Sequence, residues 1–255
     1  TENDLRFAVG TLIRSKKQVA SVNQFISSVR GLFSYCKKFG IIQKNPASTI
    51  HVLKSPKKLP SYLSKTEASQ ICLQPEEHEL LWEKRDQALF LMLLSSGSRV
   101  SELSALRFRD LSFDKSSAIV HGKGSKERRI FFSKEAVCKF EEYLEDRKIR
   151  YNKTKFEPTD PLFVNQSGTK LTSRGIRYIV SRYSSEKEGT GKNISPHAFR
   201  HTFATTMLNN GADIRVVQEM LGHSSISTTQ HYTHLTRESI QKSYNLAHPH
   251  SGEKK

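Results

Sequence analysis

Side chains suited to anion binding, proton transfer or nucleophilic attack are spread between residues 99 and 232. The candidates are Arg99, Glu102, Lys123, His197, Arg200, His223 and Tyr232. His197 and Arg200 are one helical turn apart, so on a helix they would share a face. Each residue alone indicates little, because an arginine near a glutamate is usually a surface ion pair, and a tyrosine on an amphipathic helix is usually half-buried. Only their combination can indicate a function.

Two of the histidines have the spacing of a zinc site. His197 and His201 stand at i and i+4, as in the metalloprotease motif. No glutamate follows His197 directly, however, and no cysteine lies nearby. We therefore predict no metal, and we expect the chemistry to need no cofactor.

The chain is strongly basic. It has 41 Lys and Arg against 25 Asp and Glu, a formal charge of +16 and a pI near 9.8. The excess is concentrated in residues 1–60, where Glu2 and Asp4 are the only acids. Such a field attracts polyanions, of which nucleic acid is the commonest. An acidic membrane surface is the rival partner, but we find no amphipathic or lipidated anchor, so the sequence predicts nucleic acid and no membrane.

Cysteine usage and hydropathy indicate the compartment. Cys36, Cys72 and Cys138 are widely spaced and odd in number, which is neither a disulfide framework nor a metal motif. The longest apolar run, Ala88–Leu94, is far too short to span a bilayer. We expect a cytoplasmic protein.

The elements that must position these residues fall into two domains. Apolar residues from Val22 to Phe33 recur at helical spacing, and Gly40 stops that helix. The Pro- and Lys-rich stretch Ser55–Pro60 reads as an extended, positive linker. We predict a helical domain at 1–54, a linker at 55–63, a larger domain at 64–247 and a tail at 248–255.

The larger domain is predicted to be mainly helical with a small antiparallel β-sheet, an α+β fold. Ser64 and Glu67 form a capping box, and the hairpin pairs Ala118–Val120 with Arg129–Phe132. Ser227 can cap a short helix that carries Tyr232. The other predicted elements are helices at Glu83–Ser95, 134–150, Thr172–Tyr183, His197–Asn210, 214–221 and Arg237–Leu246, and a strand at Asp160–Val164.

Five motifs in order resemble those of the tyrosine recombinase (lambda integrase) family. They are GSRVSEL at 97–103, GKGSKER at 122–128, SPHAFRHTFAT at 195–205, LGHS at 221–224, and Tyr232. Within the family the chain is similar to the Xer recombinases, which resolve chromosome dimers. Ser98 departs from the larger apolar residue common there. Family members also carry another helix ahead of the segment starting at Thr1, so we expect the first domain to be incomplete.

The resemblance implies a role for each candidate. Tyr232 would attack a DNA phosphorus and leave a 3′-phosphotyrosine, and Arg99 and Arg200 would clamp the non-bridging oxygens. His197 would be the base, and Lys123 would protonate the leaving 5′-oxygen. The remaining roles are a hydrogen bond from His223 to the phosphate and orientation of Arg99 or His197 by Glu102.

The resemblance also implies the architecture and the partners. A helical core-binding domain and a catalytic domain would form a two-domain clamp on double-stranded DNA. Recombination would proceed through a Holliday junction in a homo- or hetero-tetramer, with a second Xer recombinase or a septal DNA translocase as possible partners. The expected DNA contacts are Arg30, Lys57, Lys58, Lys126, Arg128 and Arg129.

Three alternatives stay open at this point. A DNA-binding relative that lost catalysis would have a damaged active site, whereas all the expected positions are filled here. A type IB topoisomerase uses the same nucleophile on single DNA sites, although the chain length and the Xer-like ends favour a recombinase. The integrase of a mobile element would share every motif with a chromosome dimer resolvase.

Overall fold

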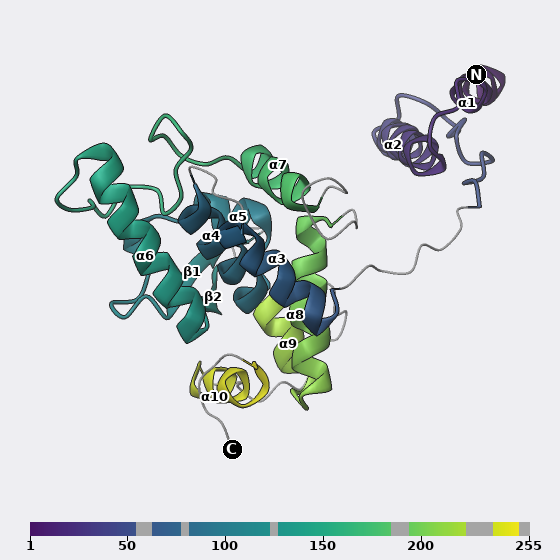
Figure 1. Ribbon diagram of the computed structural model, residues 1–255. Coiled ribbons are helices and arrows are strands. Elements are labelled where there is room, and N and C mark those ends of the chain that lie inside the picture. Colours follow the sequence, from purple (N-terminus) through teal and green to yellow (C-terminus); the bar gives the residue numbers. More distant parts are fainter. Residues whose placement is uncertain (55–62, 78–81, 123–126, 185–193, 223–236, 250–255) are drawn as a thin grey trace. The chain divides into compact units, whose positions relative to one another are not determined.

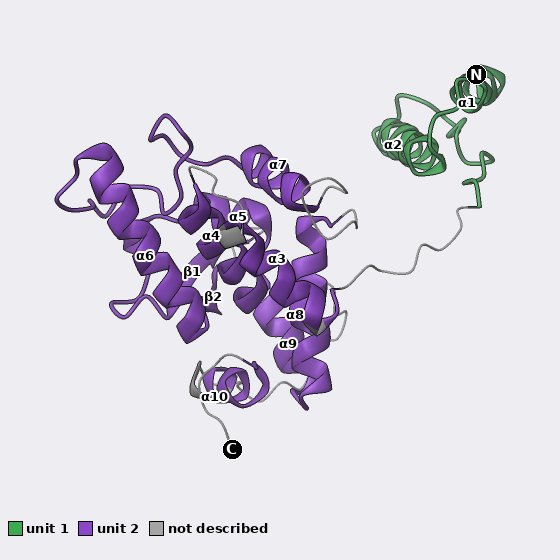
Figure 2. Ribbon diagram, in the orientation of Figure 1, with its two compact units in different colours: residues 1–59 green, residues 60–255 purple. Residues whose placement is uncertain are grey.

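The structure is a computed structural model, and it describes residues 1–54, 63–77, 82–122, 127–184, 194–222 and 237–249. The chain divides into two compact units, Thr1–Leu59 (unit 1) and Pro60–Lys255 (unit 2) (Figure 2). The boundary falls within the segment 55–63 that we predicted as a linker, of which residues 55–62 lie outside the described ranges. Within those ranges, every helix is too short or too polar to cross a bilayer.

Unit 1 is built on two helices, α1 (Glu2–Arg14) and α2 (Val19–Lys38). α1 starts with a capping box between Thr1 and Asp4, a signal that we did not use, so α1 was missed. The two helices bury a small core that is completed by the segment after α2. Its buried residues are Val9, Val22, Ile26, Ala47 and Ile50.

Unit 2 is mainly helical with one antiparallel hairpin, which confirms the predicted fold class (Figure 1). Its elements are α3 (Lys65–Glu77), α4 (Glu83–Ser96), α5 (Val100–Ala105), the 3-10 helix η1 (Phe108–Asp110), β1 (Ser117–His121), β2 (Glu127–Phe131), α6 (Lys134–Tyr151), α7 (Ser173–Ser184), α8 (Pro196–Asn209), α9 (Ile214–Leu221) and α10 (Arg237–Ala247). The predicted strand Asp160–Val164 is wrong. That segment makes only isolated bridges, from Pro161 to Arg107 and from Val164 to Lys170.

α4 is the centre of unit 2 and packs against α3, α6 and α8 (Figure 1). It is buried on all sides, as expected for a helix with apolar residues around its whole circumference. It ends at Gly97, whose φ of 59° is left-handed. A Cβ on Gly97 would lie 2.4 Å from Cδ1 of Phe203. Glycine is therefore needed where the chain leaves α4 against α8 and enters the segment with Arg99.

The hairpin joins two cores. β1 and β2 pair in the register Ser117 to Phe131 and His121 to Glu127. Ala118, Val120 and Ile130 enter the main core around α4, whereas Phe131 packs in a second core with α8, α9 and α10. This double anchoring holds the start of β2 beside the end of α9.

The first residue after α10, which is also the first residue of the predicted tail at 248–255, packs against the second core. His248 is only 6% exposed and stacks on Tyr244 with ring centroids 4.9 Å apart. The backbone N–H of His248 donates to the carbonyl of Tyr244, which prolongs the last turn of α10. Residues 250–255 lie outside the described ranges.

Candidate active site

Arg99 and Glu102 form the first part of the site, where α4 gives way to α5. Arg99 is the N-cap of α5, and its backbone N–H donates to Oε2 of Glu102 at 2.7 Å. Nη1 of the same arginine donates to Oε1 of Glu102 at 2.9 Å. Glu102 is buried, whereas the Arg99 side chain is 39% exposed. The carboxylate therefore holds a guanidinium that faces solvent.

Arg200 approaches the same place from α8. This helix begins at Pro196, one residue before the predicted start at His197, and Pro196 at the first helical position needs no N–H partner. Nη1 of Arg200 donates to the carbonyl of Gly97 at 2.8 Å, and Nη2 donates to the carbonyl of Leu221 at 2.6 Å. Arg200 thus joins the end of α4 to the end of α9, and it lies next to the Arg99 segment.

The end of α9 collects three arginines from three different elements. The carbonyls of Met220, Leu221 and Gly222 accept hydrogen bonds from Arg128, Arg200 and Arg99, respectively. The last carbonyls of a helix have no partners within the helix and carry partial negative charge. They are thus suited to holding cations, and the helix end gathers the guanidinium groups at one point.

The charges at this point are strongly coupled. Burial would raise the pKa of Glu102, but hydrogen bonds from Arg128 and Arg99 outweigh it and lower the pKa to about 2. Burial, together with the charges of Arg99 and Arg128, lowers the pKa of Arg200 to about 10. The guanidinium groups of Arg99, Arg128 and Arg200 thus interact with a single carboxylate, that of Glu102. The cluster has a net positive charge that an anion would neutralise.

The lowered pKa of Glu102 predicts how the free energy of unfolding depends on pH. Because the folded pKa lies below the ordinary 4.5, the contribution is fully present above pH 4.5 and is lost as the pH falls toward 2. It amounts to about 3 kcal/mol. We expect Glu102→Gln to be less stable than the wild type at neutral pH, with a difference that shrinks below pH 4.5. Urea unfolding followed by fluorescence of the single Trp82 measures this.

Glu141→Gln is the matched control for that experiment. Glu141 also pairs with a cation, Lys115, at 2.7 Å, but its side chain is 54% exposed. Exposed pairs contribute roughly 0–1 kcal/mol, so the control should show little change with pH. Equal behaviour of the two variants would contradict the stabilising role of Glu102.

The other predicted catalytic residues are placed only in part. His197 is exposed on α8, one turn before Arg200. Lys123, His223 and Tyr232 lie outside the described residues. In the sequence, Lys123 comes four residues before the start of β2 at Glu127, and His223 directly follows Gly222. Among the predicted DNA contacts, Lys57, Lys58 and Lys126 lie outside them as well.

Arg128 is one of the predicted DNA contacts, but its described partners all lie within the protein. Its side chain is only 12% exposed, and its guanidinium is bound to Glu102 and to the carbonyl of Met220. Arg30 and Arg129 are half-buried. Arg30 donates to the carbonyl of Ile50, and Arg129 donates to Oγ of Ser117 at 2.9 Å. Their contacts with DNA stay predictions.

The main-chain acceptors of the cluster could not be predicted from the sequence. The carbonyls of Gly97 and residues 220–222 hold the arginines, and a carbonyl has no side-chain signature. The available signal was indirect: each acceptor lies at the end of a helix that a glycine closes.

Comparisons with known proteins agree with this geometry. Residues 61–239 match the model of the phage integrase family. Tyrosine recombinase XerC of Treponema denticola is 46% identical over 257 residues, which cover 98% of this chain and 84% of that protein. Tyrosine recombinase XerC of Bacillus subtilis is 38% identical over 235 residues, covering 92% and 76%.

Solved structures show the same fold. The crystal structure of XerA recombinase aligns with a TM-score of 0.56 and 28% identity, covering 98% of this chain and 84% of that one. The Tn1549 transposon integrase in complex with circular intermediate DNA aligns with a TM-score of 0.69 and 25% identity, covering 95% and 84%. The chain belongs to the phage integrase family and is a tyrosine recombinase of the Xer type, an enzyme that breaks and rejoins DNA strands.

Proposed function

We propose that this chain recombines specific DNA sites by forming a 3′-phosphotyrosine on Tyr232, with Arg99 and Arg200 holding the scissile phosphate. The observation that carries the proposal is the cationic cluster at the end of α9. Arg99 and Arg200 both donate to carbonyls of that helix end, Arg99 to Gly222 and Arg200 to Leu221. A phosphodiester carries one negative charge, which this cluster would neutralise.

The arginines favour the transition state for a physical reason. A guanidinium has five N–H donors in a plane and can bind two phosphate oxygens at once. The hydrogen bonds described for Arg200 use two of its donors, so others remain for the phosphate. As the nucleophile approaches, negative charge grows on the non-bridging oxygens, and donors already in place stabilise it without reorganisation.

The proton transfers follow from the residues flanking the cluster. The phenol of Tyr232, with an ordinary pKa of ~10, would give its proton to His197 as its oxygen attacks phosphorus. The bond from phosphorus to the 5′-oxygen breaks, and Lys123 would protonate that oxygen. His223 would donate to a non-bridging oxygen. The phosphotyrosine preserves the bond energy, so a 5′-hydroxyl of another strand can reverse the step without ATP.

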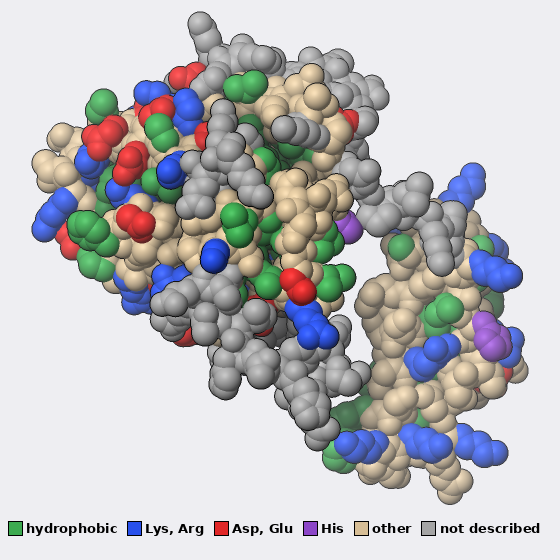
Figure 3. Space-filling view, turned by 90° about the horizontal axis from the view of Figure 1, so that it is seen from below, with side chains coloured by type: hydrophobic (Ala, Val, Ile, Leu, Met, Phe, Trp, Pro, Cys, Tyr) green, Lys and Arg blue, Asp and Glu red, His purple; other side chains and the backbone are tan. Residues whose placement is uncertain are grey.

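Double-stranded DNA is the proposed substrate for both units. Lys and Arg side chains are scattered over the face of unit 1 shown in Figure 3. Lys57, Lys58, Lys126, Arg30 and Arg129 are proposed to contact the backbone. Solved relatives include XerH bound to its difH substrate. Two sites with two subunits each would require a tetramer, homomeric or with a second Xer recombinase, and a septal DNA translocase is a further proposed partner.

Chromosome dimer resolution in the cytoplasm is the proposed biological role. The identity to proteins named XerC over nearly the whole chain favours it over mobile-element integration. Sequencing the DNA attached to the protein after incubation with fragmented genomic DNA identifies the site. A single chromosomal site would support the role, whereas the ends of a mobile element would refute it.

The chemistry is tested with a nicked suicide duplex built on the recovered site. We expect a covalent adduct, and we expect the DNA to be attached to the peptide that contains Tyr232 after proteolysis. Stable binding without an adduct, or attachment to another residue, would refute the proposal. Recombinant product from two-site DNA distinguishes a recombinase from a topoisomerase, which would relax single sites only.

A further inference from the structure

The Arg128 side chain is much less exposed than that of Arg99, 12% against 39%. Its Nη1 and Nη2 donate to the two carboxylate oxygens of Glu102, each at 2.8 Å. Its Nε donates to the carbonyl of Met220, also at 2.8 Å. Every nitrogen of the guanidinium therefore has a partner within the protein. This geometry suits a structural role, in which Arg128 holds its partners in place, better than a contact with a phosphate.

Arg128 determines both the ionisation and the orientation of the Glu102 carboxylate. The two oxygens of this carboxylate accept from Arg128 and, on the other side, from the backbone and the side chain of Arg99. The hydrogen bond from Arg128 is the largest of the influences that lower the pKa of Glu102. Arg128 thus keeps the carboxylate ionised and in one orientation. Glu102 in turn fixes the direction of the Arg99 guanidinium.

Arg128 also joins three elements through one side chain. It stands on β2, bonds to Glu102 on α5, and bonds to Met220 in the last turn of α9. A Cβ on Gly222 would lie 3.0 Å from Cδ of Arg128, and Gly222 has a φ of 64°. A glycine is needed there both for the left-handed turn and for the passage of this arginine.

We propose that Arg128 is a positioning residue for DNA cleavage, which acts through Glu102 on Arg99 and locks β2 to the end of α9. The inference rests on the proposed function. Two segments with catalytic residues leave the locked elements: residues 123–126 precede β2, and His223 follows Gly222. Fixing β2 against α9 therefore fixes the points from which Lys123 and His223 start.

The competing role, a direct phosphate contact, predicts different measurements. Loss of one phosphate contact weakens DNA binding and reduces the dependence of log K on log salt by about 0.9. Loss of a positioning residue leaves binding and its salt dependence intact but misplaces a catalytic group, which can cost about 10²-fold in rate. Binding and cleavage therefore separate the two roles.

The experiment measures single-turnover cleavage of the suicide duplex and DNA affinity across a salt series. We expect Arg128→Ala to cleave about 10²-fold more slowly than the wild type with unchanged affinity and salt dependence. We expect Arg128→Lys to recover part of the rate, because an ammonium keeps the charge beside Glu102 but cannot span both oxygens and Met220. If Arg128→Ala does not fold, as Trp82 fluorescence would reveal, Arg128→Lys carries the test alone.

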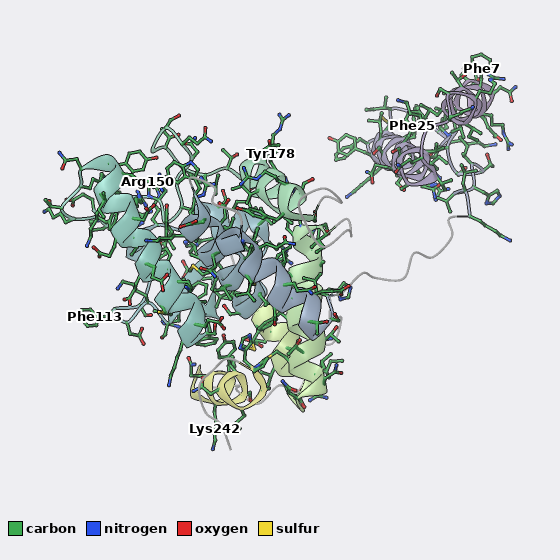
Figure 4. All side chains as sticks on the ribbon, viewed as in Figure 1. Phe7, Phe25, Phe113, Arg150, Tyr178 and Lys242 are labelled. Atoms are coloured by element: carbon green, nitrogen blue, oxygen red, sulfur yellow. The ribbon has the colours of Figure 1, made fainter. Side chains whose placement is uncertain are left out.

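A double-mutant cycle tests whether Arg128 acts through Glu102. We expect Arg128→Ala combined with Glu102→Gln to be no more than about threefold slower than the slower single variant. We expect Glu102→Gln alone also to slow cleavage by about 10²-fold, so independent effects would multiply to about 10⁴-fold in the double variant. Arg150→Ala is the matched control, since Arg150 on α6 also pairs with a carboxylate, that of Asp146 at 2.6 Å (Figure 4). Its cleavage rate should equal that of the wild type.

Three results would overturn the inference: wild-type cleavage by Arg128→Ala, a parallel loss of affinity and salt dependence, or multiplicative effects in the double variant. These are distinct from failure of the proposed function. A wild-type chain that forms no adduct on Tyr232 would refute the recombinase mechanism itself, whereas wild-type cleavage that persists without Arg128 refutes only the positioning role.

Discussion

Arg200→Ala will lower the single-turnover rate of DNA cleavage by about 10³-fold, with a much smaller effect on DNA affinity. Arg200 is held by two carbonyls on two helices, those of Gly97 and Leu221, so its direction is fixed before DNA arrives. A donor fixed in this way acts mainly on the charge that develops in the transition state. DNA affinity depends on many phosphate contacts and should change little when one is lost.

The cleavage assay needs a variant that gives the background signal and a control variant. Tyr232→Phe gives the background of the adduct assay, because phenylalanine has no nucleophilic oxygen. Arg107→Ala matches Arg200→Ala, since Arg107 also donates to a main-chain carbonyl, that of Thr159, but it is exposed and is not one of the three arginines of the cluster. We expect it to cleave at the wild-type rate. Arg200→Ala within tenfold of the wild type would contradict the clamp.

Without bound DNA, the arginine cluster carries positive charge that Glu102 alone does not neutralise. Arg200 has a pKa of about 10 because burial and two neighbouring arginines disfavour its charge. A bound phosphate would remove that penalty, so the fold bears an unfavourable charge arrangement that the substrate relieves. Strongly shifted pKa values cluster at functional sites, and here the shifted group lies among cations that a bound phosphate would neutralise. The arginine cluster therefore supports the family assignment on physical grounds, independently of sequence identity.

Local rules predicted the ends of the elements in unit 2. Ser64 and Glu67 form the predicted capping box, with hydrogen bonds of 2.8 and 3.2 Å. Asp213 caps α9 by accepting from the N–H of Arg215. Gly97 and Gly222, which follow the predicted helices Glu83–Ser95 and 214–221, end α4 and α9 in left-handed conformations. These features depend on residues within four positions of one another, so the sequence shows them directly.

Features that depend on distant pairs could not be predicted in this way. Arg128 was predicted to contact DNA as part of the two-domain clamp that the resemblance implies. Its partners, Glu102 and Met220, are 26 and 92 positions away, and only the packing of β2 against α9 brings them together. The apolar run Asp160–Val164 was predicted as a strand, but Leu162 and Phe163 enter the core without a partner strand beside them.

A second buried ion network was also missed, and it joins α4 to α7. Asp86 is fully buried, and its Oδ1 accepts from Arg85 at 2.7 Å. Its Oδ2 accepts from Arg182 at 3.4 Å and from the hydroxyl of Tyr183 at 3.2 Å. Burial raises the pKa of Asp86, and the two arginines only partly oppose the shift. The free-energy cost of burying this charge therefore exceeds the stabilisation that its partners provide.

That imbalance predicts an asymmetric response to mutation. Asp86→Ala leaves Arg85, which is only 5% exposed, without a counter-charge, and should reduce the free energy of unfolding by about 3–5 kcal/mol. Replacing both charges by apolar residues, Arg85→Met with Asp86→Leu, should cost much less, because no unpaired charge stays buried. The two substitutions are therefore strongly non-additive.

Urea unfolding followed by Trp82 fluorescence measures both variants, since the ring of Trp82 lies 4.8 Å from the Arg85 guanidinium carbon and reports on unit 2. Asp146→Ala is the control: Asp146 pairs with Arg150, whose side chain is 32% exposed and can turn to water when its partner is removed. We expect a loss of about 1 kcal/mol or less there. If the double variant were less stable than Asp86→Ala, the buried ion pair would be a net source of stability. That result would contradict the upward shift of the Asp86 pKa.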